Sequence, residues 1–236
     1  MMLGRRPLTG ASERRERSRQ EMRSAILDAA GEIVAAEGVD GLTIRAVAQA
    51  VGYSPGALYE YFDSKEAILA SLYFDGTDGL GTYCERAVAA LPEGAGAIAA
   101  IDALGHAYRD YALQHAELYR LVFGGFKTPP QAPDVDCPED SPGGFGTLIR
   151  IATQGVDDRS MIELPPPVIA CTAWAAVHGF VSLELTGHLT GGDGPGLPPA
   201  SAAEGRQRRD QMFDALVSMV LFGLVREEHR TKSTVT

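Results

Sequence analysis

The sequence predicts an all-α protein of about nine helices. Strand-type alternation of polar and apolar residues between turn signals is absent almost everywhere. Apolar residues instead recur at three- and four-residue steps, as in Ile26, Ala30, Ile33 and Val34. Glycine, proline and N-capping residues separate the periodic stretches. The chain of 236 residues is long enough to bury a sizeable core in one or two domains.

The capping signals place each helix along the chain. Gly38 ends the first helix, Thr43 caps the second, and Gly52 suits the left-handed turn after it. Ser54 and Pro55 suit the N-cap and first position of the third helix. The expected helices cover about residues 18–37, 43–51, 55–62, 64–91, 95–115, 116–123, 147–154, 168–189 and 202–228.

Composition and charge divide the chain into segments. Residues 124–146 and 190–201 are rich in Gly and Pro and are expected to be loops. Residues 1–17 are polar and rich in arginine, which predicts a basic flexible arm. We expect a helix-turn-helix domain over residues 18–65 and a larger helical domain over residues 66–230.

The net charge is unevenly distributed. Lys and Arg number 21 against 31 Asp and Glu, which gives −10 and argues at face value against a nucleic-acid partner. Residues 1–65 hold nine basic and nine acidic residues, so the remaining residues supply the whole −10. Residues 1–24 hold seven Arg and three Glu, a net charge of +4. The acidity therefore belongs to the body, and the basic arm can follow the DNA backbone or minor groove or act as a solubilising tail.

Several protein classes are excluded. Cys84, Cys137 and Cys171 have no metal-ligand spacing, so we expect free thiols, no metal and no cofactor. No apolar run of membrane-spanning length and no signal peptide is apparent, which predicts a cytoplasmic protein without a membrane partner. No P-loop, HExxH motif or catalytic-triad pattern is found, so an enzyme is not expected.

Residues 43–62 form a helix, a tight turn and a second helix. The first helix carries the small residues Ala46, Ala48 and Ala50, and Gly52 occupies the turn. Two short helices that cross closely need small contact residues and a permissive turn residue. The pattern alone fits a DNA-binding helix-turn-helix and a plain helical hairpin about equally.

The longer motif resembles the TetR family of transcription regulators. The stretch GLTIRAVAQAVGYSPGALYEYFDSKEAIL, residues 41–69, matches that family's helix-turn-helix at nearly every position, and ILDAAGEIVAAEGVDGLT resembles its first helix. The resemblance implies that the helix starting at Ser54 enters the major groove by its N-terminal end. Its candidate DNA-binding residues are Thr43, Arg45, Ser54, Pro55, Gly56, Ala57, Tyr59, Tyr61 and Lys65.

These residues suggest different kinds of DNA contact. Ser54 to Ala57 are small, so close backbone approach and apolar contact with thymine methyl groups are expected there. Arg45 can reach either a guanine edge or a phosphate, whereas Thr43, Tyr59, Tyr61 and Lys65 carry donors suited to phosphate oxygens. Thr43 and Ser54 also serve as helix caps, and Lys65 taken alone is an ordinary solvated lysine. The acidic Glu60 either repels phosphate or accepts a hydrogen bond from cytosine.

The C-terminal two thirds resemble the ligand-sensing half of the same family. AWAAVHGFVSLEL is similar to the Trp-x-x-x-His-Gly stretch of one C-terminal subgroup, and HAELYRLVFGG resembles its usual companion segment. Trp174 and His178 are four residues apart and share a helix face, where they line a pocket or, as we prefer, pack in the core. Further candidate ligand-binding residues, each more often found in a core, are Tyr108, Tyr111, Leu118, Phe123, Phe145 and Met161.

The resemblance also implies partners. In this family the last two helices form a four-helix dimer interface, so we expect a homodimer through residues 168–189 and 202–228 that binds a palindromic operator in double-stranded DNA. We expect a repressor released by a small, largely apolar effector of unknown identity. The alternatives are a transcriptional activator, a DNA-binding regulator without an effector and, more remotely, a helical protein-interaction module.

Overall fold

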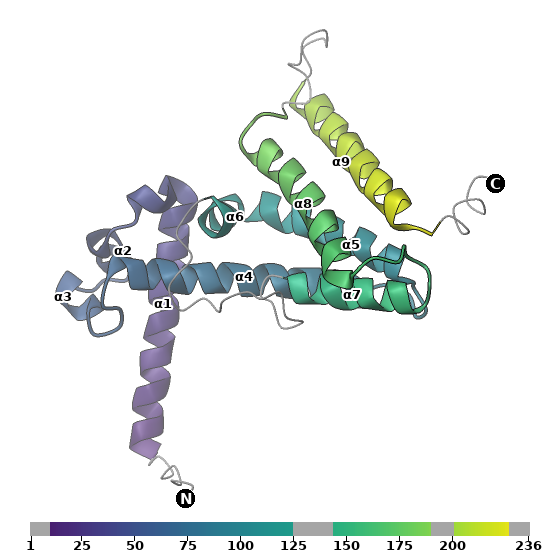
Figure 1. Cartoon of the computed structure of the whole chain (residues 1–236). Coiled ribbons are helices and arrows are strands. Elements are labelled where there is room, and N and C mark those ends of the chain that lie inside the picture. Colours follow the sequence, from purple (N-terminus) through teal and green to yellow (C-terminus); the bar gives the residue numbers. More distant parts are fainter. Residues whose placement is uncertain (1–9, 125–143, 190–200, 227–236) are drawn as a thin grey trace, which may run out of the picture. The chain divides into compact units, whose positions relative to one another are not determined.

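A computed structural model describes residues 10–124, 144–189 and 201–226, and nine α-helices lie within these ranges (Figure 1). The all-α prediction is confirmed. The helices are α1 (Gly10–Gly41), α2 (Ile44–Ala50), α3 (Pro55–Leu58), α4 (Lys65–Ala89), α5 (Ala97–Gln114), α6 (Ala116–Phe123), α7 (Phe145–Asp157), α8 (Pro166–Leu185) and α9 (Ala202–Leu224).

The chain forms two compact units. One comprises the described residues within Met1–Asp75 and Glu117–Pro130, and the other comprises those within Gly76–Ala116 and Gln131–Thr236. The boundary falls inside α4, ten residues later than the expected end of the helix-turn-helix domain at residue 65. The reason is that Ile68, Leu69 and Leu72 on the first part of α4 belong to the core of the first unit.

The described part of the expected flexible arm, residues 10–17, is helical. The helix α1 begins at Gly10, so residues 10–17 extend it by about two turns instead of forming a mobile segment. The prediction for those residues is wrong because arginine and glutamate are good helix formers and need no buried face to continue an existing helix. Residues 1–9 of the expected arm lie outside the described residues.

The first unit is a small helical core around the turn between α2 and α3. Buried apolar residues from α1, α2, α3, α4 and α6 meet there, among them Ile26, Val47, Leu58, Phe62 and Leu121. Gly38 adopts a φ of 73° inside α1, where the chain kinks before the loop to α2. This core fixes the short helix α3 against four longer ones.

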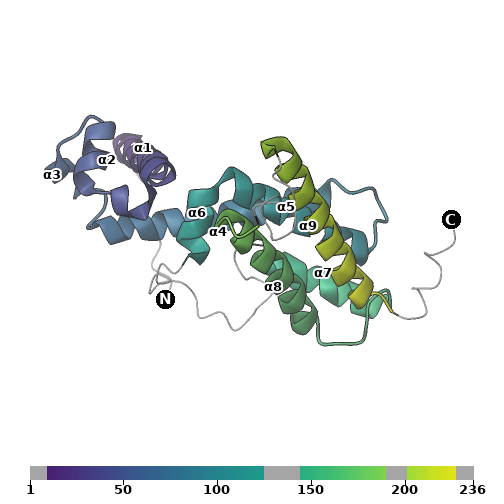
Figure 2. The same ribbon diagram turned by 90° about the horizontal axis from the view of Figure 1, so that it is seen from above.

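The second unit packs α5, α7, α8 and α9 together (Figure 2). The helix α8 contacts each of the other three. By length and composition α8 is apolar enough to cross a membrane, so the expectation that no apolar run reaches that length is wrong for this helix. It nevertheless carries Glu184 and His178 toward neighbouring helices. This arrangement is that of a packing helix with one exposed apolar face.

A buried ion cluster joins three of these helices. Arg109 on α5 donates from Nε and Nη2 to the two carboxylate oxygens of Glu184 on α8, at 2.7 and 2.8 Å. Its Nη2 also lies 2.8 Å from Asp210 on α9, and Arg209 approaches Glu184 at 3.1 Å. The side chains of Arg109 and Glu184 are only 8% and 6% exposed. A bidentate pair of this kind is directional, so it sets how α5, α8 and α9 lie against one another.

A second polar link joins α5 to α9 one turn away. His106 Nε2 lies 3.2 Å from Asp214, and its Nδ1 lies 3.0 Å from the carbonyl of Asp102. Partial burial disfavours the charged ring, but the hydrogen bonds to Asp102 and Asp214 and their negative charges outweigh it. The pKa of His106 is therefore raised above its ordinary value near 6.5.

The raised pKa predicts a pH-dependent contribution to stability. Folding holds the His106 proton more tightly than the unfolded chain does, so the contribution is complete below the unfolded pKa and disappears as the pH rises through the folded pKa. In urea unfolding between roughly pH 5.5 and 8.5, the stability advantage of the wild type over His106→Gln should shrink as the pH rises. Asp214→Asn should weaken this dependence, and a difference independent of pH would contradict the assignment.

Candidate nucleic-acid interface and ligand pocket

The turn between α2 and α3 is built by two helix caps and one glycine. Thr43 Oγ1 accepts the backbone N–H of Ala46 at 3.0 Å, and Ser54 Oγ accepts that of Ala57 at 3.2 Å. Gly52 adopts a φ of 72°, a left-handed conformation that glycine takes without a Cβ penalty. The capping roles expected of Thr43 and Ser54 are thus present, and both residues remain exposed.

The predicted DNA-binding residues gather on the exposed side of this turn. Arg45 is exposed on the first turn of α2, and Tyr59, which is 54% exposed, follows α3. The exposed members of the set are Thr43, Arg45, Ser54, Pro55, Gly56 and Tyr59, and the half-buried ones are Ala57, Tyr61 and Lys65. The N-terminal end of α3 therefore offers only small side chains, with longer donors beside it.

Lys65 has a structural contact that the sequence pattern does not reveal. Its ammonium donates to the carbonyl of Val39 at 3.0 Å, which ties the start of α4 to the end of α1 just beyond the kink at Gly38. An ammonium has three donors, so this bond leaves others for a phosphate. The side chain therefore positions the domain whether or not it also contacts DNA.

Two arginines of α1, counted among the basic residues of positions 1–24, contact the segment that follows α3. Arg19 donates to the carbonyl of Glu60 at 2.9 Å, and Arg23 donates to the carbonyl of Tyr61. The Arg23 guanidinium lies 4.0 Å from the centre of the Phe62 ring. Sequence reasoning missed these contacts. The four-residue spacing of the arginines is a signal that they share a helix face, but only the fold shows what that face meets.

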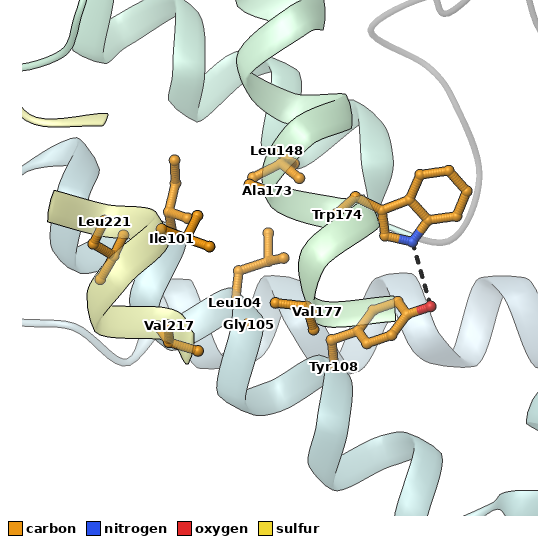
Figure 3. Close-up of a pocket in the computed structure, with 11 residues that line it drawn as sticks. Ile101, Leu104, Gly105, Tyr108, Leu148, Ala173, Trp174, Val177, Val217 and Leu221 are labelled. Carbon is orange, nitrogen blue, oxygen red and sulfur yellow. Dashed lines mark hydrogen bonds between the residues drawn. The ribbon is translucent and has the colours of Figure 1, made fainter. Parts of the chain in front are cut away.

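The second unit contains a narrow apolar cavity of about 30 Å³ between α5, α7, α8 and α9 (Figure 3). Tyr108 and Trp174 of the predicted ligand-binding set line it. The remaining lining residues are Ile101, Leu104, Gly105, Leu148, Ala173, Val177, Val217, Val220 and Leu221. These aliphatic residues escaped prediction because their spacing is the same as that of ordinary core residues.

A polar chain runs along one side of this cavity. Trp174 Nε1 donates to the Tyr108 hydroxyl at 3.3 Å, as the dashed line in Figure 3 marks. The same hydroxyl lies 3.0 Å from His178 Nδ1, and the Ser182 hydroxyl lies 3.4 Å from His178 Nε2. Each ring nitrogen therefore faces a hydroxyl that can donate or accept. Burial lowers the pKa of His178, so the neutral ring is favoured.

The remaining predicted ligand-binding residues do not line this cavity. Phe145 packs beside Trp174 with ring centres 5.5 Å apart, and the Tyr111 hydroxyl donates to the carbonyl of Gly76 at 3.2 Å. Met161 is fully buried, and a Cβ added at Gly155 would lie 2.5 Å from its sulfur. Phe123 and Leu118 lie on the part of α6 that belongs to the first unit. The structure thus gathers Tyr108, Trp174 and His178 and separates the others from the cavity.

Apolar side chains also lie exposed on α8 and α9. Met219 is 66% exposed and Phe222 is 61% exposed on α9, and Met212 lies on the same stripe at a seven-residue spacing from Met219. Val168 and Leu183 are exposed on α8. Large apolar groups aligned in this way mark an interaction surface.

The described residues show no metal-binding constellation. No group of three or more His, Cys, Asp or Glu side chains in these ranges is arranged to hold a metal ion. Cys84 is buried, and burial raises the pKa of its thiol to about 12, so it is inert at neutral pH. Cys171 is an exposed free thiol, and Cys137 lies outside the described residues.

Comparisons with known proteins match both parts of the chain to one family of regulators. Residues 26–72 match the family described as bacterial regulatory proteins, tetR family, and residues 101–220 match the tetracyclin repressor-like C-terminal domain. The uncharacterized HTH-type transcriptional regulator Rv0681 of Mycobacterium tuberculosis is 29% identical over 170 residues, which cover 70% of this chain and 71% of the relative.

Solved structures share the fold. A protein of unknown function from Rhodococcus sp. RHA1 has a TM-score of 0.70 and 28% identity, over 87% of this chain and 96% of its own. A TetR family transcription regulator from Marinobacter aquaeolei VT8 has a TM-score of 0.62 at 19% identity, over 91% of this chain and 100% of its own. The two matched domains, the exposed helix-turn-helix and the all-α body together show that this chain belongs to the TetR family of DNA-binding transcriptional regulators, which are not enzymes.

Proposed function

We propose that this regulator is a cytoplasmic homodimeric repressor that binds a palindromic operator and releases it when a small, largely apolar effector binds. One observation carries the proposal. The helix α9 presents Val217, Val220 and Leu221 to the cavity and Met219 and Phe222 to solvent. A ligand that moves α9 therefore also moves the surface that would meet a second subunit.

The helix-turn-helix supports operator reading through α3. Its N-terminal end is exposed and carries only small side chains, so the backbone can approach the floor of the major groove. Arg45 is the long cationic side chain on the neighbouring α2. It supplies the guanine or phosphate contact that the small residues of α3 cannot make.

The first prediction concerns Arg45. Because the side chain is exposed, Arg45→Ala should leave the unfolding transition unchanged. Affinity for an operator selected from a random duplex pool should fall by roughly 5- to 150-fold if Arg45 reads a guanine, or more weakly, with a salt slope lower by about one, if it contacts a phosphate. Fluorescence anisotropy across a salt series measures both. Arg206→Ala, an exposed arginine on α9, is the matched control, and unchanged affinity for Arg45→Ala would refute the assignment.

The exposed stripe on α9 supports self-association. Met212, Met219 and Phe222 follow one another at spacings of seven and three residues, which places them on one face of α9 over about three turns, and α8 adds Val168 and Leu183. Obligate homodimer interfaces resemble a protein core cut in half, and this stripe has that character. A two-fold dimer also matches a palindromic operator, because each subunit then reads one half-site.

The second prediction tests the dimer. Met219→Glu places a charge in the centre of the stripe, and an unpaired charge cannot be buried at an interface without a large free-energy cost. Analytical ultracentrifugation should show wild-type particles of about twice 25.1 kDa and variant particles of 25.1 kDa. Leu113→Glu, at an exposed apolar residue of α5, should leave the dimer intact. A wild type that sediments as a monomer would refute the proposed interface.

The apolar lining of the cavity supports an apolar effector, and its small volume means that such an effector would have to enlarge the cavity to bind. About 30 Å³ accommodates one or two waters, whereas pockets for drug-sized ligands measure roughly 300 Å³ or more. Aliphatic side chains from α5, α7, α8 and α9 provide the walls. An effector would therefore separate these helices, and the free energy of that change would couple binding to DNA affinity, typically by about 1–3 kcal/mol.

The third prediction concerns Gly105, a glycine of α5 that lines the cavity. A Cβ added there would lie 3.6 Å from Val177 and 4.0 Å from Val217, which is ordinary van der Waals contact. Gly105→Ala should raise the free energy of unfolding by about 0.5–1 kcal/mol, because alanine favours helix, and should weaken the binding of apolar molecules that stabilise the wild type. A thermal-shift screen measures both effects. An unchanged response to every ligand would place the effector site elsewhere.

The alternatives predict different results in the same assays. An activator would bind the operator with the same affinities but would raise transcription from a reporter promoter. A regulator without an effector would show no ligand that changes both the thermal transition and operator affinity. The apolar cavity next to α9 favours a regulator that responds to an effector over one that does not.

A further inference from the structure

The helix α3, which is proposed to read the operator, depends on neighbouring residues for its orientation. It spans only Pro55–Leu58, and isolated helices of that length are unstable in water. Leu58 and Phe62, which are 1% and 3% exposed, anchor its buried side. The backbone carbonyls at the end of the segment also need partners, because the last carbonyls of a helix have none within the helix.

Two arginines of α1 supply partners at that end. Arg19 donates to the carbonyl of Glu60 at 2.9 Å, and its guanidinium lies 5.9 Å from the Tyr61 ring centre. Arg23 donates to the carbonyl of Tyr61 and stacks 4.0 Å from the centre of the Phe62 ring. Successive α-helical residues are roughly 100° apart, so residues 19 and 23 differ by roughly 40° and share one face.

We propose that Arg19 and Arg23 are positioning residues that set the angle at which α3 meets DNA, rather than phosphate contacts of a basic arm. The proposal rests on operator binding by α3. Arg23 is half-buried, with a carbonyl bond and an aromatic stack that fix its side chain toward Phe62. A guanidinium held in this way fixes the backbone of residues 60–62, which follow α3 directly.

A positioning residue and a phosphate contact affect specific and non-specific DNA affinity differently. Contacts to bases require α3 at a defined angle, whereas attraction to phosphates needs only positive charge near the duplex. Loss of a positioning arginine should therefore lower affinity for the operator and spare affinity for an unrelated duplex. Loss of a phosphate contact would lower both and would also reduce the salt slope by about 0.9 per contact.

The test compares Arg19→Ala, Arg23→Ala and the double variant in the full chain. For each variant, affinity is measured across a salt series for the operator selected by the wild type and for an unrelated duplex of equal length. The control is Arg17→Ala, which removes the same charge from an exposed residue roughly 200° around α1 from Arg19. Circular dichroism melting confirms that each variant is folded at the assay temperature.

We expect the ratio of specific to non-specific affinity to fall by roughly 10- to 100-fold for Arg23→Ala and by less for the exposed Arg19→Ala. The salt slope and the Arg17→Ala ratio should match those of the wild type. An unchanged ratio, a slope lowered by about one, or a loss of affinity explained by the unfolded fraction alone would overturn the proposal. A wild type without operator preference would refute operator binding itself, which keeps the two failures distinct.

Discussion

Arg109 carries a positive charge between three helices, and a charge that is removed from water must be paired. Glu184 of α8 and Asp210 of α9 provide that pairing with hydrogen bonds of 2.7 to 2.8 Å. Because a planar guanidinium donates to carboxylates only along fixed directions, the cluster allows few relative positions of α5, α8 and α9. The cavity, the polar chain at His178 and the exposed stripe on α9 all depend on this arrangement.

The second unit combines two kinds of surface on one helix. Up to Asp214, α9 bears polar residues that bind α5 and α8, namely Arg209, Asp210 and Asp214. Its second half closes the apolar cavity on one side and exposes Met219 and Phe222 on the other. The proposed ligand would therefore displace the apolar end of α9 more easily than the part held by ion pairs. Because the cavity wall and the proposed dimer interface lie on the same part of α9, movement of that part by the proposed effector would also move the interface.

The first unit achieves its function through short elements supported by longer ones. Thr43 and Ser54 cap two helices of seven and four residues, and α1, α4 and α6 bury their inner faces. Lys65, Arg19 and Arg23 then bind backbone carbonyls around the turn. Basic residues in this unit thus have contacts within the protein that a count of charges cannot distinguish from contacts with DNA.

The sequence by itself determined the helices, their caps and the family, because these depend on local patterns such as Thr43, Gly52 and Ser54–Pro55 that lie within a few residues of what they control. It also placed Trp174 and His178 on one face of one helix. Only the tertiary structure decided that Tyr108 joins them while Met161 and Tyr111 do not, because those neighbours come from segments distant in sequence. For the same reason, only the fold shows that Arg19 and Arg23 contact the segment after α3. The spacing of two side chains defines the helix face they share, but packing decides what that face contacts.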